Sequence, residues 1–441
     1  MRIPLALLAI ALTLSLFAAP LAGAAGNNVT VTRTVSPAPG LGGEASNYIV
    51  NITVYSDGSV EVTIKSNKTC ADIFGNTGLS IIVPLYAELS SRAQVKKSGG
   101  GYEITADYFF TLTETLSDTL SLKTYTAIKI LLEHESGNTY RVLANLTVQT
   151  ERVNGAQVSL TNSSSIEFRG TLTVSQEGIN INGTITEWAA PSEKLPLDPD
   201  SFREALMSSP NVTLNYYTYT VQEGGKSAVI HLNITLKPGA FNQLPNSLKG
   251  MYETLRNMTI NKLTLSSYVT LNPNRTITMR ATEHVEAFAK KDTLTFADLY
   301  QVTSPLEPKR LSFTSGANES LKKIASKLQV LPSTSETSCG WKKPLEIKFF
   351  RLKASNDPAE TLGTIRVLLQ DYLGLPGKTK VTLIAGPGVK IDGKTREQVT
   401  LSSLGNQKIE VSNKTAAAIV AGALAVAAAF VAAAILISRR S

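Results

Sequence analysis

The side chains best able to do acid–base or metal chemistry are few in this sequence and stand apart from one another. The three His residues are His134, His231 and His284, and none lies in an H-E-x-x-H pattern, in which two His on one helix face bind zinc. The G-x-S-x-G pattern that presents a nucleophilic Ser on a sharp turn is also absent from the sequence. These spacings predict no catalytic residue, no metal site and no cofactor, so we expect the protein not to be an enzyme.

Acidic residues come nearest to a cation site. Asp198, Asp200 and Glu204 could present carboxylates to Ca²⁺, but the Gly and the terminal Glu of an EF-hand loop are missing. Helix capping explains the same residues better, because Asp200 or Ser201 can cap a short helix that ends near Met207. A carboxylate pair for glycoside hydrolysis stays open among the 35 acidic residues, since the fold and not the spacing sets such a pair.

The acceptor sequence for N-linked glycans, Asn-X-Ser/Thr, is the pattern that this sequence repeats most. It occurs at 12 of the 25 Asn residues, which exceeds chance for this Ser and Thr content. The excess indicates selection for glycan acceptors on an exported surface. The alternative is a Thr-rich β protein in which Asn and Thr share polar strand faces. The acceptors are Asn28, Asn51, Asn67, Asn145, Asn162, Asn182, Asn211, Asn233, Asn257, Asn274, Asn318 and Asn413.

The two ends of the chain predict its location. Residues 1–24 have a cationic start, an apolar stretch and small residues before a cleavage point, as in a secretory signal peptide. Residues 416–437 carry no charge and are long enough to cross a hydrocarbon core about 30 Å thick. Arg439 and Arg440 follow, and such cations stay on the cytoplasmic side. We expect a single-pass protein of the cell membrane with its ectodomain outside and a cytoplasmic tail, residues 438–441.

Two alternatives to this topology remain. The N-terminal segment could be kept as an anchor, and the Ala-rich C-terminal segment could be a buried helix. Outside the cell, Cys70 and Cys339 would meet an oxidising environment that favours a disulfide between them. In the chain-entropy model, so long a loop would contribute roughly 5 kcal/mol of stability. Two unpaired thiols are the alternative.

Period-two alternation of apolar and polar residues predicts the fold. In residues 48–55 the even positions are mostly apolar, a turn follows at Ser56-Asp57-Gly58, and residues 60–65 alternate again. This is typical of a β-hairpin with one buried face. Residues 141–150 and 228–236 alternate in the same way. The first part of the ectodomain is therefore predicted to be an antiparallel β-sandwich or a large curved sheet.

Changes in composition divide the chain. We expect an all-β ectodomain over residues 25–186 and, after a Pro-rich linker, α+β domains. The first of these is 187–338, and the second is a small membrane-proximal unit over 339–415. Residues 331–343 are polar and predict a second linker between the α+β units. Within the last unit, Asp357-Pro358 predicts a helix start. The fold class is therefore mainly β with α+β.

Charge excludes several classes of protein. The chain has 18% charged and 43% hydrophobic residues, which excludes intrinsic disorder. Its net charge of +8 includes Arg2, Arg439 and Arg440, so the ectodomain is only mildly basic. No run of Lys and Arg is interleaved with aromatic residues, and we expect no nucleic-acid partner.

Taken together, the signal peptide, the glycan-acceptor-rich β ectodomain and the final span with an Arg-Arg tail resemble archaeal single-span cell-surface glycoproteins, including those associated with S-layers. The chain departs from the commoner pattern because it lacks a Ser/Thr-rich stalk and is not strongly acidic. The leading hypothesis is a non-enzymatic structural or adhesive role in the cell envelope, with an envelope protein or a second copy of the chain as partner. The alternatives are a receptor or carrier for a small ligand or lipid, and a hydrolase of extracellular polymers.

Overall fold

The structure is a computed structural model that describes residues 48–70, 72, 83–115, 122–154, 157–190, 195–241, 257–272, 276–303 and 319–411. The expected signal peptide, membrane span and tail lie outside these residues, as do Asn28, Asn274, Asn318, Asn413, Arg439 and Arg440. Within the described ranges, no helix has the length and apolar character needed to cross a membrane.

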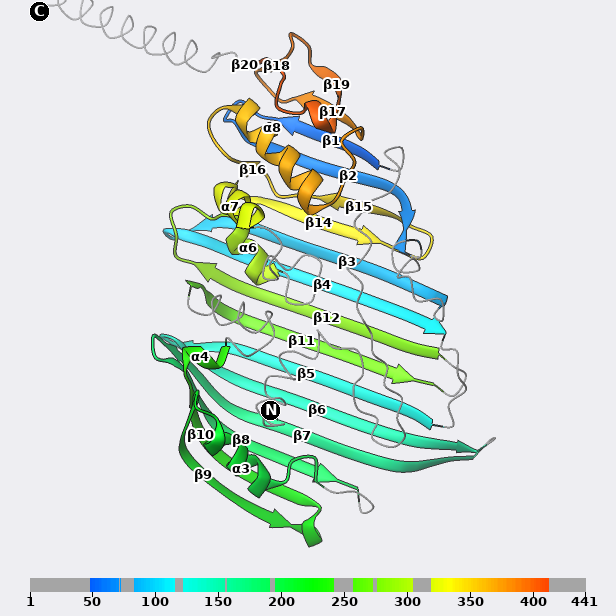
Figure 1. Ribbon diagram of the computed structural model, residues 1–441, viewed down its shortest axis with the longest axis vertical. Coiled ribbons are helices and arrows are strands. Elements are labelled where there is room, and N and C mark those ends of the chain that lie inside the picture. The colour runs from blue at the N-terminus through cyan, green and yellow to red at the C-terminus, as the bar shows by residue number, and fades with distance from the viewer. Residues whose placement is uncertain are drawn as a thin grey trace, which may run out of the picture.

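Most of the described strands belong to one sheet that runs along the length of the molecule (Figure 1). Its first nine strands are β1 (Tyr48–Val54), β2 (Val60–Thr69), β3 (Val83–Ser98), β4 (Gly101–Thr115), β5 (Leu122–Ser136), β6 (Thr139–Asn154), β7 (Gln157–Ser175), β8 (Gly178–Ala189) and β9 (Val212–Gln222). The others are β10 (Ser227–Leu236), β11 (Thr259–Leu271), β12 (Thr276–Ala289), β13 (Gln329–Val330), β14 (Ser333–Cys339), β15 (Pro344–Lys348), β16 (Leu352–Lys353), β17 (Lys380–Ala385) and β19 (Arg396–Thr400). A separate pair is formed by β18 (Val389–Ile391) and β20 (Ile409–Val411).

The order of the strands in space differs from their order in the chain. From one edge to the other the sheet reads β19, β17, β1, β2, β15, β14, β3, β4, β12, β11, β5, β6, β7, β8, β10 and β9. The short strands β16 and β13 extend it beside β2. All of these pairs are antiparallel except β1 with β17, which is parallel. The expected mainly β class is therefore confirmed, but the sheet is mixed and not wholly antiparallel.

The sheet continues through the expected domain boundaries. The boundary after residue 186 falls inside β8, and the boundary after residue 338 falls inside β14. The prediction of a linker over residues 331–343 is wrong, because β14 forms there between β3 and β15. Its side chains are Ser, Thr and Glu up to Cys339, so no apolar alternation marks it. Pairing with β3 and β15 satisfies the backbone N–H and C=O groups of β14 on both sides, which no side-chain pattern reports.

Alternating apolar side chains form the core on one face of the sheet. Val50, Ile52 and Val54 on β1 are fully buried, as the hairpin prediction requires. The same face carries Ile230, Leu232 and Ile234 of β10 at the far end of the sheet, and one continuous core cluster contains both sets. The helices α3, α6, α7 and α8 lie in front of the sheet on this face in Figure 1. We call it the helix face and the opposite one the outer face.

The helices that cover the helix face are short. They are α3 (Pro199–Ser208), α4 (Pro238–Phe241), α6 (Phe296–Thr303), α7 (Glu319–Lys327) and α8 (Pro358–Val367). Single-turn segments are η2 (Glu223–Gly225), η4 (Leu368–Tyr372) and η5 (Leu401–Ser403).

Local signals set where these helices begin. The predicted start at Asp357-Pro358 is confirmed, because the Asp357 side chain accepts a hydrogen bond from the Ala359 N–H. The predicted cap of α3 is wrong by two or three residues. Asp198, and not Asp200 or Ser201, is the N-cap, because Pro199 fits the first helical position after it.

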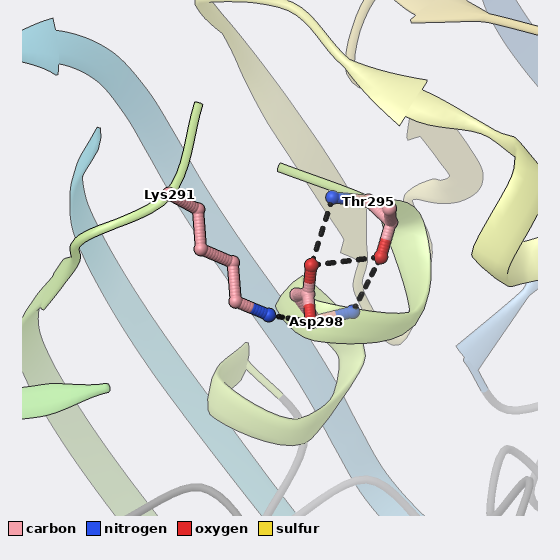
Figure 2. A network of polar contacts seen from close by, with 3 residues as sticks. All are labelled: Lys291, Thr295 and Asp298. Atoms are coloured by element: carbon pink, nitrogen blue, oxygen red, sulfur yellow. Dashed lines mark hydrogen bonds and ion pairs between the residues drawn. The ribbon is translucent and has the colours of Figure 1, made fainter. Parts of the chain in front are cut away.

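A reciprocal cap fixes α6 over β12 (Figure 2). The Thr295 N–H donates to Asp298 Oδ2 at 3.0 Å, and the Asp298 N–H donates to Thr295 Oγ1 at 3.3 Å. This is the capping-box arrangement, with Asp in the place of Glu. Lys291 adds an ion pair to Asp298 Oδ1 at 2.7 Å and so ties the end of β12 to the helix.

The disulfide prediction agrees with the structure, which joins Cys70 to Cys339 with their Cα atoms 5.3 Å apart. Both cysteines are buried in a small cluster with Ala87, Leu112 and Leu345. The bond connects the end of β2 to the end of β14, and β15 lies between these two strands. It therefore crosslinks two strands in the part of the sheet nearer to β19.

Candidate functional site: a polar groove on the outer face

A surface groove of about 320 Å³ lies across β3, β4, β12 and β11. Period-two alternation places polar side chains here because their neighbours along each strand are buried on the helix face. Residues that line the groove include Ser90, Arg92, Asp107, Phe109, Thr264, Ser266, Thr282 and His284. The groove offers hydroxyls, charges of both signs and the phenyl ring of Phe109.

Charges alternate in sign across the strands that form this groove. Strand register places Glu336, Arg92, Asp107 and His284 in one row on β14, β3, β4 and β12. Arg92 Nε lies 3.4 Å from Glu336 Oε1. Opposite charges on directly paired strands stabilise a sheet, although exposed pairs contribute at most about 1 kcal/mol each.

A second row continues the alternation towards the middle of the sheet. Glu286, Lys262, Glu133 and Arg141 stand opposite one another on β12, β11, β5 and β6. Arg141 and Glu133 form an ion pair, and the pKa of Glu133 is lowered by the hydrogen bond from Arg141. The two rows make the outer face a charged but nearly balanced surface.

His284 is held by both of its ring nitrogens. Nδ1 lies 2.7 Å from Asp107 Oδ1, and Nε2 lies 3.0 Å from Glu286 Oε1. The hydrogen bonds to Asp107 and then Glu286 raise the pKa of the imidazole, since both carboxylates favour its protonated form. A ring that uses both nitrogens in this way suits an ion-pair bridge better than a general base, which needs one nitrogen free for its substrate.

A second groove of about 480 Å³ adjoins the first at Ser90. It lies beside the disulfide and is lined by Tyr86, Glu88, Trp341 and, among others, Lys343. The Tyr86 hydroxyl donates to Glu88 Oε2 at 2.6 Å. The two grooves together follow β3 along the outer face.

Seven of the glycan acceptors in the described residues are not buried. Five of them lie on strands with their side chains on the outer face, namely Asn51, Asn67, Asn145, Asn182 and Asn233. Asn211 and Asn257 lie before β9 and β11 and are also not buried. Asn162 lies on β7, and nothing further is described of its side chain.

Two of these acceptors crowd each other. Asn182 on β8 stands directly opposite Asn233 on β10, and such pairs have Cβ atoms about 5 Å apart. Asn233 Oδ1 also accepts hydrogen bonds from Asn180 and Asn215, at 2.8 and 2.9 Å. Asn182 is the more exposed of the two.

The remaining residues singled out from the sequence stay separate. His134 bonds the Gly137 carbonyl at the β5–β6 turn, and His231 bonds Thr184 on the neighbouring strand. Asp200 accepts from the Tyr219 hydroxyl. Across the described ranges, no group of three or more His, Cys, Asp or Glu residues could hold a metal ion.

Glu187 is a buried acid that sequence reasoning missed. It lies on the helix face of β8 and is fully buried. Its Oε2 accepts from the Leu197 N–H at 2.8 Å, while Oε1 has no hydrogen-bond partner among the described residues. Burial, followed by the charge of Asp198, raises its pKa to about 7 even though the Leu197 bond opposes the shift. Glu187 is two residues from Ile185 and from Ala189, so it shares their buried face of β8. This spacing is the sequence signal that could have predicted its burial.

Comparison of the chain with protein-family models and with curated proteins finds no match.

Proposed function

We propose that the chain is a membrane-anchored extracellular glycoprotein with a structural or adhesive role in the cell envelope. The observation that supports this most directly is the placement of five glycan acceptors on the outer face of one sheet. Glycans attached there would cover the face opposite the helices without disturbing the core.

A large, clamped sheet also suits a structural role. The strand ladder would transmit load through backbone hydrogen bonds, and the Cys70–Cys339 bond crosslinks β2 and β14 within it. The outer-face grooves provide a polar surface for contacts with neighbouring envelope material.

The proposal is tested on protein isolated from the membranes of its natural source. The measured mass of the intact protein should exceed the mass of the polypeptide alone. Peptide mapping should find glycans on Asn51, Asn67, Asn145 and Asn182. Asn180, which lies on the same face but outside an acceptor sequence, is the control and should be unmodified. Surface biotinylation of intact cells should label the chain. An unmodified mass together with no surface labelling would contradict the proposal.

A receptor for a small polar ligand is a second candidate, supported by the two adjoining grooves. Titration calorimetry with neutral and acidic oligosaccharides tests it on the full chain. The receptor hypothesis would be favoured if Arg92→Gln weakened binding. The control Lys96→Gln, at an exposed residue outside both grooves, should leave binding unchanged. No binding to any ligand of this class would argue against it.

A further inference from the structure

The sheet ends at β9 in an edge that carries no charge. In the described part of the chain β9 pairs with β10 alone, and it is the lowest strand in Figure 1. Its eleven residues, Val212–Gln222, contain no Asp, Glu, Lys or Arg. A shift in register at Asn215 leaves Tyr216–Gln222 as a regular stretch of about 23 Å.

Proteins normally protect such an edge, because its outward N–H and C=O groups pair readily with another strand. Short length, Lys side chains, Pro and inward-pointing charges are the usual protection. The regular stretch of β9 has none of these, whereas the opposite edge strand, β19, has five residues with Arg396 and Glu397 among them. The two edges of one sheet therefore differ in their readiness to pair.

A separate observation places apolar surface at the same edge. Half of the large hydrophobic residues that are exposed in the described structure lie on β9, on α3 beside it, or at the end of nearby β8. They are Trp188, Met207, Tyr216, Tyr219 and Val221, of which Met207 is 64% and Tyr216 54% exposed. These side chains lie on both faces of the sheet beside one edge, as expected where another strand would continue the sheet.

We propose that this edge pairs with a second copy of the chain, β9 antiparallel to β9 across a two-fold axis. A neutral strand set against its own copy places no like charges opposite one another. Tyr216 would pack on the outer face of the junction, and Tyr219 and Val221 on the helix face.

The number of copies follows from the contrast between the edges. An isologous contact uses the β9 edge of both copies, and in the described residues the other end of the long sheet is the β19 edge. This edge is short and charged, so the assembly closes at two and does not grow into a filament. This inference does not depend on the proposed envelope role.

The test measures the mass of the full-length chain in detergent micelles by light scattering, corrected for detergent, over a dilution series. The edge variant is Thr218→Lys/Thr220→Lys, which puts two cations on exposed positions of β9. The matched control is Thr186→Lys. Thr186 is an exposed Thr in register with Thr220, two strands further in on the same face.

We expect two polypeptides per particle for the wild type and for Thr186→Lys, and one for the double variant. The single variant Thr220→Lys should weaken dimerisation several-fold (roughly two- to tenfold), because the two-fold axis places the added cation in the junction twice. Circular dichroism and the melting temperature report whether each variant folds. A wild-type monomer at all concentrations, a dimer that survives the double substitution in folded protein, or open-ended assembly would each overturn the proposal.

Discussion

The two ends of the sheet are built differently. Near β19, the Cys70–Cys339 bond holds β2 to β14, and Arg351 bonds Asp57 and Ser59 in the β1–β2 turn at 2.9 and 2.6 Å. Near β9, the described structure has no disulfide, and α3 packs on the strand through Phe202 and Leu206. One end is stabilised by covalent and ionic clamps, the other by apolar packing around a buried acid.

The two ends of the sheet should therefore lose stability under different solution conditions. A reducing agent should loosen the β19 end, because the clamp there is a disulfide. A rise in pH should weaken the β9 end, because Glu187 must ionise inside it. The unprotected strand edge and the end of the sheet without a disulfide are both at β9. Binding of a second copy at this edge would add the stabilisation that this end lacks.

Removal of the disulfide should have the largest effect. The variant Cys70→Ala/Cys339→Ala should lose roughly 5 kcal/mol of unfolding free energy, because the unfolded chain is no longer closed into a long loop. Urea denaturation measures this, and the variant should not respond to added reductant. A variant as stable as the oxidised wild type would show that the clamp does not stabilise this end.

Cavity-creating substitutions should destabilise the two ends of the sheet independently. Leu206→Ala in α3 and Leu362→Ala in α8 each remove a fully buried side chain and should each cost about 3–4 kcal/mol. Hydrogen exchange should speed up at β9 and β10 for Leu206→Ala, and at β2 and β16, which α8 contacts, for Leu362→Ala. Equal loss of protection over the whole sheet in both variants would contradict a division into two ends.

The buried acid predicts a pH dependence at the β9 end. Because the folded-state pKa of Glu187 is raised to about 7, folding favours its protonated form. Stability should be highest below the unfolded-state pKa of about 4.5, fall as the pH rises to about 7, and then level off, with a total loss of up to about 3 kcal/mol. Denaturation at pH 4.5 and pH 8 measures this fall, which Glu187→Gln should abolish. The exposed control Glu103→Gln should keep it, and a fall that persists in Glu187→Gln would exclude Glu187 as the cause.

The smallest expected effect concerns His284, between the two ends. Its pKa is raised by Asp107 and Glu286, so its ion pairs stabilise the fold below the ordinary His pKa of about 6.5 and are lost as the pH rises through the folded value. NMR titration of the ring should show the raised pKa, and Asp107→Asn should lower it. The distant control Asp292→Asn should leave it unchanged. Equal pKa values in wild type and Asp107→Asn would contradict the bridge.

Local patterns explain which parts of this fold can be predicted from the sequence. Alternation places Val50, Ile52 and Val54 on a buried face, and Asp357-Pro358 marks the start of α8, because both signals act over a few residues. No local pattern reports that β1 pairs with β17, or that polar β14 is a strand, since distant partners decide both. The grooves were not predicted either, because the register of β3, β4 and β12 brings their residues together.

The parallel pairing of β1 with β17 has a consequence for biosynthesis. Synthesis from the N-terminus produces the β1–β2 hairpin early, but β17, which pairs with the other edge of β1, is made more than 300 residues later. Until then one edge of β1 is open, and non-local pairs of this kind form slowly. The hairpin is therefore a segment of the nascent chain that a chaperone is expected to bind until β17 is made.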